Sequence, residues 1–261
     1  MPLSLSARID DWLAAPPARA RVGWIGRYSF AHRGLHGAGV PENSPAAFAA
    51  AIERGYGIEC DIQRSGDGEP MVFHDWDLDR LTGETGAVAA RSAAELERIG
   101  LTGSTDTIPS LRRFLDQVAG RAPLLIEVKS RRDLPVSGLC AAIRDRPSGY
   151  AGPHGVMSFD PRVSRWFSSH CPQTVRGLVV SEEGAGGLAG RLRRRLALWH
   201  ARPDFLAYDI RDLPSRFAAR QRGRGLVLAS WTVRSAALLE RARLHADAPI
   251  AEGAGIGAAG E

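Results

Sequence analysis

The stretch GIECDIQRS, residues 57–65, decides how the rest of the sequence is read. Apolar and polar residues alternate in it, and the turn-forming residues 65–68 follow, which is typical of a β-strand. Because strand side chains alternate between faces, Glu59 and Asp61 share one face at about 7 Å, and three apolar side chains share the other. A buried, unpaired carboxylate is costly, and two neighbouring carboxylates repel each other. This strand therefore needs a source of positive charge close to its polar face.

A second stretch, LLIEVKS at residues 124–130, carries Glu127 and Lys129 at the same spacing after an apolar run. If both strands belong to one parallel barrel, their four polar side chains point inward together. Three carboxylates and one lysine leave an excess of negative charge, which a hard divalent cation neutralises through oxygen ligands. The sequence therefore predicts an Mg²⁺ or Ca²⁺ site formed by Glu59, Asp61 and Glu127.

Strand-like and helix-like segments alternate along most of the chain. One helix is expected in SPAAFAAAIERG, with Ser44 as its N-cap, Pro45 at its first position and Gly55 as a stop. The expected strands are residues 28–34, 57–64, 124–130, 155–159, 174–180, 205–210, 226–233 and 248–250. Eight strands with helices between them predict an α/β fold of the (β/α)₈ TIM-like barrel type, with a doubly wound open sheet as the alternative.

Residues 67–108 do not fit this alternation. They contain a short strand-like segment, PMVFHD, followed by loops and one short helix, and we interpret them as a small insertion after the second barrel strand. We expect residues 1–27 to form an N-terminal helical extension, because Leu5, Ile9, Trp12 and Leu13 recur at helical spacing. The barrel catalytic domain is then residues 28–252, and residues 253–261 form a flexible glycine-rich tail.

Composition indicates an ordinary globular protein of 261 residues with a net charge of +5. Its longest apolar runs fall short of the ~18 residues of a membrane span, so we expect no stable membrane insertion. The N-terminus lacks a signal-peptide pattern, and the three cysteines have no zinc spacing, which together favour a cytoplasmic protein. The arginine-rich GRLRRRLALWHA (190–201) is interpreted as a solvated helix face, because it lacks the interleaved aromatic residues that favour nucleic-acid binding.

Two histidines follow predicted strands, at the end where a barrel forms its active site. The first strand ends in His32 and Arg33, and the segment MVFHD ends in His74. A metal with cationic neighbours suits a phosphate ester, and two histidines suit proton transfer near neutral pH. We interpret Lys129 as functional, because it is the one lysine among 34 basic residues. His36 and His154 are expected to be structural.

At these residues the sequence resembles the glycerophosphodiester phosphodiesterases. AHRGLHGAGVPENSPAAF, GIECDIQRSGDGEPMVFHD, LDRLTG, IPSL, LLIEVKS, MSFDP and WTV carry the resemblance, which runs from about residue 30 to 250. It implies a TIM-like barrel that hydrolyses glycerophosphodiesters to glycerol 3-phosphate and an alcohol. It further implies roles for residues at the matching positions: metal binding by Glu59, Asp61 and Glu127, acid–base catalysis by His32 and His74, phosphate binding by Arg33 and Lys129, and a substrate cleft lined by Trp231. Glu42 and Asn43 match the P-E-N motif and are expected to shape its loop.

Two positions depart from the family's pattern. Arg234 stands where the family usually has asparagine after WTV, and the last strand ends in APIAEGAG rather than the usual acidic residue with a nearby proline. Both departures bear on which alcohol is released. Two other functions stay open: a different metal-dependent barrel hydrolase, acting on cyclic phosphates, lysophospholipids or amides, and a catalytically silent barrel used as a binding module. The sequence leaves the oligomeric state undecided.

Overall fold

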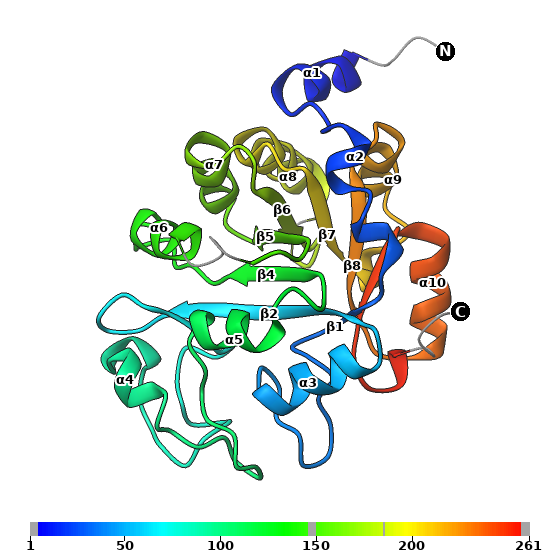
Figure 1. Cartoon of the computed structure of the whole chain (residues 1–261). Helices are drawn as coiled ribbons and strands as arrows, with labels where there is room; N and C mark the ends of the chain where they lie inside the picture. Colours follow the sequence, from blue (N-terminus) through cyan, green and yellow to red (C-terminus); the bar gives the residue numbers. More distant parts are fainter. Residues whose placement is uncertain (1–4, 146–149, 185, 257–261) are drawn as a thin grey trace.

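A closed barrel of eight parallel strands forms the centre of the computed structural model, which describes residues 5–145, 150–184 and 186–256 (Figure 1). Its strands are β1 (Phe30–Ala31), β2 (Gly57–Arg64), β4 (Leu124–Val128), β5 (His154–Ser158), β6 (Val175–Val180), β7 (Phe205–Asp209), β8 (Val227–Val233) and β9 (Ala248–Ala251). The strand β1 pairs in parallel with both β2 and β9, which closes the barrel. The predicted barrel is thus confirmed, and the open-sheet alternative is wrong.

Helices surround the barrel, as the connections between parallel strands require (Figure 1). They are α3 (Pro45–Glu53), α5 (Leu111–Val118), α6 (Ser137–Asp145), α7 (Pro161–His170), α8 (Gly187–Ala201), α9 (Arg216–Gly223) and α10 (Ala236–His245). Single 3₁₀ turns follow β7 (η3, Ile210–Asp212) and β9 (η4, Gly253–Gly255). The expected start of α3 is confirmed, because Ser44 accepts a hydrogen bond from the Ala47 N–H and Pro45 is the first helical residue.

The segment after β2 leaves the barrel and returns. The strand β3 (Pro70–Val72) lies antiparallel to β2, and the 3₁₀ turn η2 (Val88–Ala90) and the short helix α4 (Ala93–Leu96) follow it. This segment has a small apolar core of its own, which includes Met71, Phe73 and Leu78. It stands beside the β2 end of the barrel, at the lower left of Figure 1.

The chain before β1 forms α1 (Leu5–Leu13), α2 (Arg19–Val22) and the 3₁₀ turn η1 (Ile25–Arg27). Its contact with the barrel differs from the predicted apolar face, because Trp12 is 83% exposed while Asp10 is fully buried. The Asp10 carboxylate accepts hydrogen bonds from Trp199 Nε1 and Gln221 Nε2 on the barrel helices. The proposed domain boundaries stay a prediction, and most of the predicted tail, residues 257–261, lies outside the described residues.

Inward-facing side chains change from apolar to polar along the strands. Phe30, Leu125 and Ile250 belong to the apolar cluster inside the barrel. Two residues further along each strand, and therefore on the same face, come His32, Glu127 and Glu252. All strands are parallel, so these polar residues gather at one end of the barrel, where TIM barrels carry their active sites.

Candidate active site

Three buried carboxylates form the centre of this end of the barrel. Asp61 on β2 lies opposite Glu127 on β4 in the strand register, and Glu59 precedes Asp61 on the same inward face. The structure places carboxylate oxygens of all three within 4.8 Å of one another. The residues predicted to bind a metal are therefore brought together.

Their electrostatics show an excess of negative charge. Burial raises the pKa of Glu59 well above its usual value, and the charges of Asp61 and Glu127 raise it further. Burial likewise raises the pKa of Glu127. Burial also acts to raise the pKa of Asp61, but the ammonium of Lys129 and the guanidinium of Arg33 outweigh it and leave that pKa below its usual value. Oxygen donors with surplus negative charge suit a hard divalent cation.

Two cations border this group. The Lys129 ammonium lies 2.6 Å from Glu127 Oε1 and 2.9 Å from Asp61 Oδ1. Arg33 Nε lies 3.3 Å from Asp61 Oδ2, and the Arg33 main-chain N–H donates to Glu59 Oε2 at 3.0 Å. Arg33 adopts a left-handed conformation with φ of 56°, which turns its main-chain N–H and its side chain toward the same site.

The glycine after Arg33 has a packing reason. Gly34 has φ of 79°, and a Cβ built there would lie 2.8 Å from the Ala47 side chain of α3. A larger residue would push the loop that carries His32 and Arg33 away from α3.

The P-E-N motif holds the loop in place, as expected. Glu42 Oε1 accepts a hydrogen bond from Arg33 Nη1 at 2.7 Å. The Asn43 side chain both donates to Asp61 Oδ2 and accepts from the Asp61 main-chain N–H. The side chains of the motif therefore orient Arg33 and Asp61 through hydrogen bonds.

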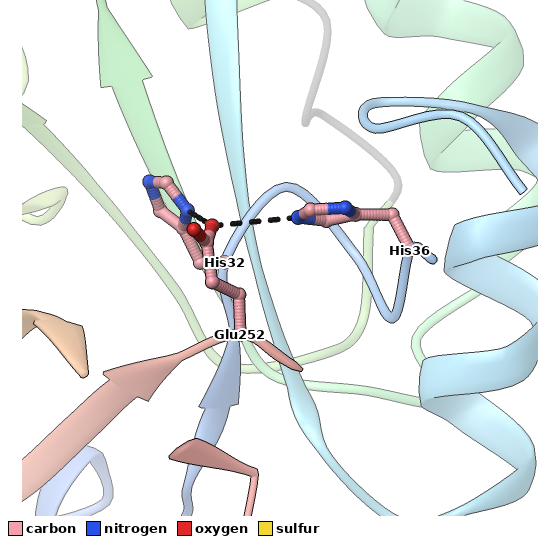
Figure 2. A group of neighbouring side chains, drawn as sticks. All are labelled: His32, His36 and Glu252. Carbon is pink, nitrogen blue, oxygen red and sulfur yellow. Dashed lines mark hydrogen bonds and ion pairs between the residues drawn. The ribbon is translucent and has the colours of Figure 1, made fainter. Parts of the chain in front are cut away.

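His32 is anchored by a carboxylate that the sequence reading did not single out. His32 Nδ1 lies 2.5 Å from Glu252 Oε2, and His36 Nε2 lies 3.4 Å from the same oxygen (Figure 2). Arg234 Nε donates to the other oxygen of Glu252 at 2.6 Å. His32 Nε2 points the other way and lies 4.0 Å from Glu59 Oε2. Burial lowers the pKa of His32, and the hydrogen bond to Glu252 offsets only part of this effect.

His74 has a similar partner in the segment after β3. His74 Nδ1 lies 2.6 Å from Asp75 Oδ1, and Arg80 Nε donates to Asp75 Oδ2 at 2.5 Å. Arg80 also pairs with Glu42, which links this segment to the P-E-N loop. Hydrogen bonds from Gln63 Nε2 to the main-chain carbonyls of His74 and Asp75 fix the backbone here. Burial lowers the pKa of His74 as well.

Open space and aromatic side chains adjoin these groups. A cavity of about 510 Å³ is lined by His74, Asp75 and Lys129, among others. Trp231 on β8 donates from Nε1 to the Ala207 carbonyl, and its ring packs edge-on against that of Phe159. Trp231 thus lies at the boundary between the apolar barrel interior and the polar residues of the candidate site, a position from which its ring can line a substrate cleft.

The structure places several residues differently from what the sequence predicted. His36 was expected to be structural, yet it contacts the carboxylate that anchors His32, while His154 packs against Tyr150 away from the site. The signal for Glu252 was available: it lies two residues beyond the buried Ile250 at the end of the last strand. Arg80 lies in LDRLTG, one of the stretches that carry the family resemblance, but its segment has no regular periodicity that would indicate its contacts.

Comparison with known proteins gives the same picture. The sequence model of the glycerophosphoryl diester phosphodiesterase family matches residues 32–251. A glycerophosphodiester phosphodiesterase of Bacillus altitudinis is 36% identical over 112 residues, which are 40% of this chain and 45% of that protein. Glycerophosphodiester phosphodiesterase 1 of Rattus norvegicus is 28% identical over 146 residues, or 52% of this chain and 43% of the rat protein. The chain thus spans less than half the length of these curated relatives.

Solved structures extend the likeness over most of the chain. A glycerophosphodiester phosphodiesterase of Thermotoga maritima is 26% identical, with a TM-score of 0.69, over 86% of this chain and 93% of that one. A phosphodiesterase of Oleispira antarctica, solved with its product sn-glycerol 3-phosphate, has a TM-score of 0.75 over 86% of this chain and 92% of that one. Its 24% identity supports the fold alone. With the family match covering most of the barrel, this chain belongs to the glycerophosphoryl diester phosphodiesterase family.

Proposed function

We propose that this chain hydrolyses glycerophosphodiesters to glycerol 3-phosphate and an alcohol. The observation that carries the proposal is the arrangement at one end of the barrel: three buried carboxylates, two cations and two histidines with carboxylate partners. Membership of the glycerophosphoryl diester phosphodiesterase family supports this choice of substrate.

Glu59, Asp61 and Glu127 would hold one Mg²⁺ or Ca²⁺. The donor set is all oxygen, and the raised pKa values of Glu59 and Glu127 mark a negative charge that Lys129 and Arg33 leave incompletely balanced. When bound, such a cation binds phosphate oxygens and stabilises the negative charge of the transition state. Arg33 and Lys129 lie against the same carboxylates and would hold the phosphate, with Trp231 lining the cleft.

His32 and His74 would carry out the proton transfers. In each ring Nδ1 is bound to a carboxylate, and no described residue hydrogen-bonds Nε2, which leaves that atom to exchange a proton with the substrate. The carboxylate fixes the ring orientation and its protonated nitrogen. We assign His32 as the acid that protonates the departing alcohol and His74 as the base that activates the nucleophile.

Free thiols are consistent with a place for the protein in a reducing compartment such as the cytoplasm. Cys60, Cys140 and Cys171 are all free thiols in the described structure. Among the described residues, no helix has the length and apolar character needed to cross a membrane.

Purified protein tests the proposal directly. We expect release of glycerol 3-phosphate from glycerophosphocholine, glycerophosphoethanolamine or glycerophosphoglycerol, loss of this activity on chelation, and recovery with Mg²⁺ or Ca²⁺. Glu59→Gln should remove the activity in the same way, whereas Glu53→Gln, on the exposed side of α3, should not. Full activity after exhaustive chelation, in protein shown by elemental analysis to be metal-free, would overturn the metal assignment.

A second candidate substrate is a lysophospholipid. A cavity of about 640 Å³ adjoins Lys129 and is lined largely by apolar side chains, including Trp76, Leu134, Val136 and Leu139. An alkyl chain would bury apolar surface there. Cleavage of lysophosphatidylcholine with a kcat/KM above that of glycerophosphocholine, lost on substitution of the half-exposed Leu134 by aspartate (Leu134→Asp), would favour this substrate over the water-soluble one.

A further inference from the structure

The helix α8 exposes an unusual row of leucines. Leu188, Leu192 and Leu196 are 81%, 56% and 52% exposed, although they belong to one helix that packs on the barrel. At 3.6 residues per turn, residues spaced by four form one stripe along a helix. Single exposed leucines are common, but a contiguous exposed apolar stripe marks a surface that contacts something else.

Arginines flank this stripe on both sides. Arg191 and Arg195 lie along one edge of it and Arg193 along the other, as their positions on the helix require. The opposite face of α8 is the one that packs, through the buried Leu198 and Ala201. The helix therefore has two faces with apolar residues. One packs on the barrel, and the other, which carries leucines and arginines, is exposed to solvent.

The positive charge of this surface is only partly compensated. Neither α8 nor its neighbour α9 contains an acidic residue, and together they carry seven arginines. Arg194 pairs with Glu182 and Arg220 with Asp10. Among the described residues, no carboxylate pairs with Arg191, Arg193, Arg195 or Arg216. Three of these four arginines, Arg191, Arg195 and Arg216, line one cavity of about 660 Å³ between the two helices, which Glu182 and Asp212 also line.

This surface continues to the mouth of the barrel. A cavity of about 870 Å³ is lined by Arg193 and Leu196 of α8 and by Phe159, which follows β5. Phe159 is 50% exposed and packs against Trp231 at the candidate active site. Whatever binds α8 therefore lies close to the entrance of the site.

We propose that α8 docks this protein on the surface of an anionic phospholipid bilayer. The leucines would enter the boundary between headgroups and acyl chains, and the arginines would pair with anionic headgroups, as in interfacial helices. A second copy of the chain is disfavoured, because two faces that each carry an excess of unpaired arginines repel each other. Nucleic acid is disfavoured because leucines, unlike aromatic residues, offer no stacking surface for bases. The proposal concerns peripheral binding and does not depend on the proposed hydrolase activity.

Vesicle co-sedimentation tests the proposal with the full chain. We expect binding to vesicles of phosphatidylglycerol and phosphatidylcholine, little binding to pure phosphatidylcholine, and weaker binding as salt rises. The double variant Leu188→Asp/Leu192→Asp should bind at least about tenfold more weakly, because it removes apolar contact and adds negative charge. Arg191→Glu/Arg195→Glu should lose binding to a similar extent.

The helix α10 supplies a matched control, since Leu244 there is 71% exposed and lies next to Arg243. Leu244→Asp should bind vesicles like the unmodified chain. Circular dichroism and thermal melting would check that all variants fold, and their rates on a water-soluble phosphodiester should match that of the parent. Equal loss of vesicle binding in the α8 and α10 variants, or no binding to anionic vesicles at low salt, would overturn the proposal. The proposal would also be overturned if the double leucine variant lost dimerisation or binding to single-stranded DNA but kept its binding to vesicles.

Discussion

His32 and His74 have the same local chemistry but are held by different parts of the molecule. Each ring binds a carboxylate through Nδ1, His32 to Glu252 at 2.5 Å and His74 to Asp75 at 2.6 Å. The first pair joins residues 220 positions apart, on the first and last barrel strands. The second joins adjacent residues in the segment after β3.

The surroundings of the two pairs differ accordingly. The His32 side chain is 10% exposed, whereas the side chains of His74 and Asp75 are 30% and 23% exposed. Closure of the barrel positions the first pair, while ion pairs to Arg80 position the second. Glu252, at 18% exposed, is nearly as accessible as Asp75, but the His32 ring is much less exposed than the His74 ring. Less water can therefore replace a partner lost from His32, so we expect its carboxylate to matter more than that of the more open pair.

Removal of either ring should have the largest effect. His32→Ala and His74→Ala should each lower kcat/KM on a natural glycerophosphodiester by about 10²–10⁴-fold, the usual contribution of general acid–base catalysis. A nitrophenyl phosphodiester separates the two roles, because its leaving group departs without a proton. The His32→Ala variant should recover much of its activity on this substrate, and the His74→Ala variant should not.

The opposite rescue pattern would exchange the roles of acid and base. Near-parental rates of both variants on the natural substrate would show that this pair does not perform the proton transfers.

Replacing the carboxylates tests the comparison itself. Glu252→Gln should lower kcat by about 10²-fold with little change in KM, because a buried partner orients the ring and fixes its protonated nitrogen. Asp75→Asn should cost about tenfold, because water reaches this pair and the Gln63 hydrogen bonds still hold the backbone. Steady-state kinetics of the two variants, with melting curves to confirm folding, measure the difference. Equal losses would mean that burial does not distinguish the pairs.

Lys129 lines the cavity on the His74 side and should not tolerate its closest substitute. Lys129→Arg keeps the charge but brings a broad planar group into a site where the ammonium contacts two carboxylates at 2.6 and 2.9 Å. We expect kcat/KM to fall at least about tenfold, equivalent to ~1.4 kcal/mol. Arg131→Lys, an exposed neighbour on the same loop, should leave the kinetics unchanged. Parental kinetics in Lys129→Arg would remove the argument for a functional lysine.

Arg234 should have the smallest effect, although it touches the buried pair through Glu252. Its side chain is 60% exposed, and exposed ion pairs contribute about 0.2–1 kcal/mol. Arg234→Asn, which restores the residue usual in the family, should therefore change kcat/KM less than about fivefold. A larger loss would show that Glu252 depends on this arginine as well as on His32 and His36.

The features that could be predicted from the sequence are those with a regular periodicity of apolar and polar residues. All eight barrel strands were expected at positions that overlap the observed ones, because each is an apolar run bounded by turn residues. The carboxylates of β2 and β4 were also predictable, since alternation along two strands places them on one face. The roles assigned to these residues remain predictions for experiment.

Contacts between residues far apart in the sequence, or within irregular segments, were harder to predict. The pairing of Glu252 with His32 exists because β1 and β9 become neighbours when the barrel closes, and no local pattern shows which strands meet. Arg80 was missed because irregular segments place side chains through ion pairs rather than alternation. The exposed face of α8 was read as solvated, because a helical pattern alone does not show that its leucines stay uncovered.

The closure of β1 against β9 also sets an order in time. A ribosome makes the chain from the N-terminus, and the proposed metal ligands, both histidines and Lys129 all precede residue 130. Glu252 follows only with the final barrel strand, so the partial chain holds a full set of reactive groups while His32 still lacks its anchor. If His32 has the proposed role, its full activity requires that the last strand has been synthesised and joined to the first.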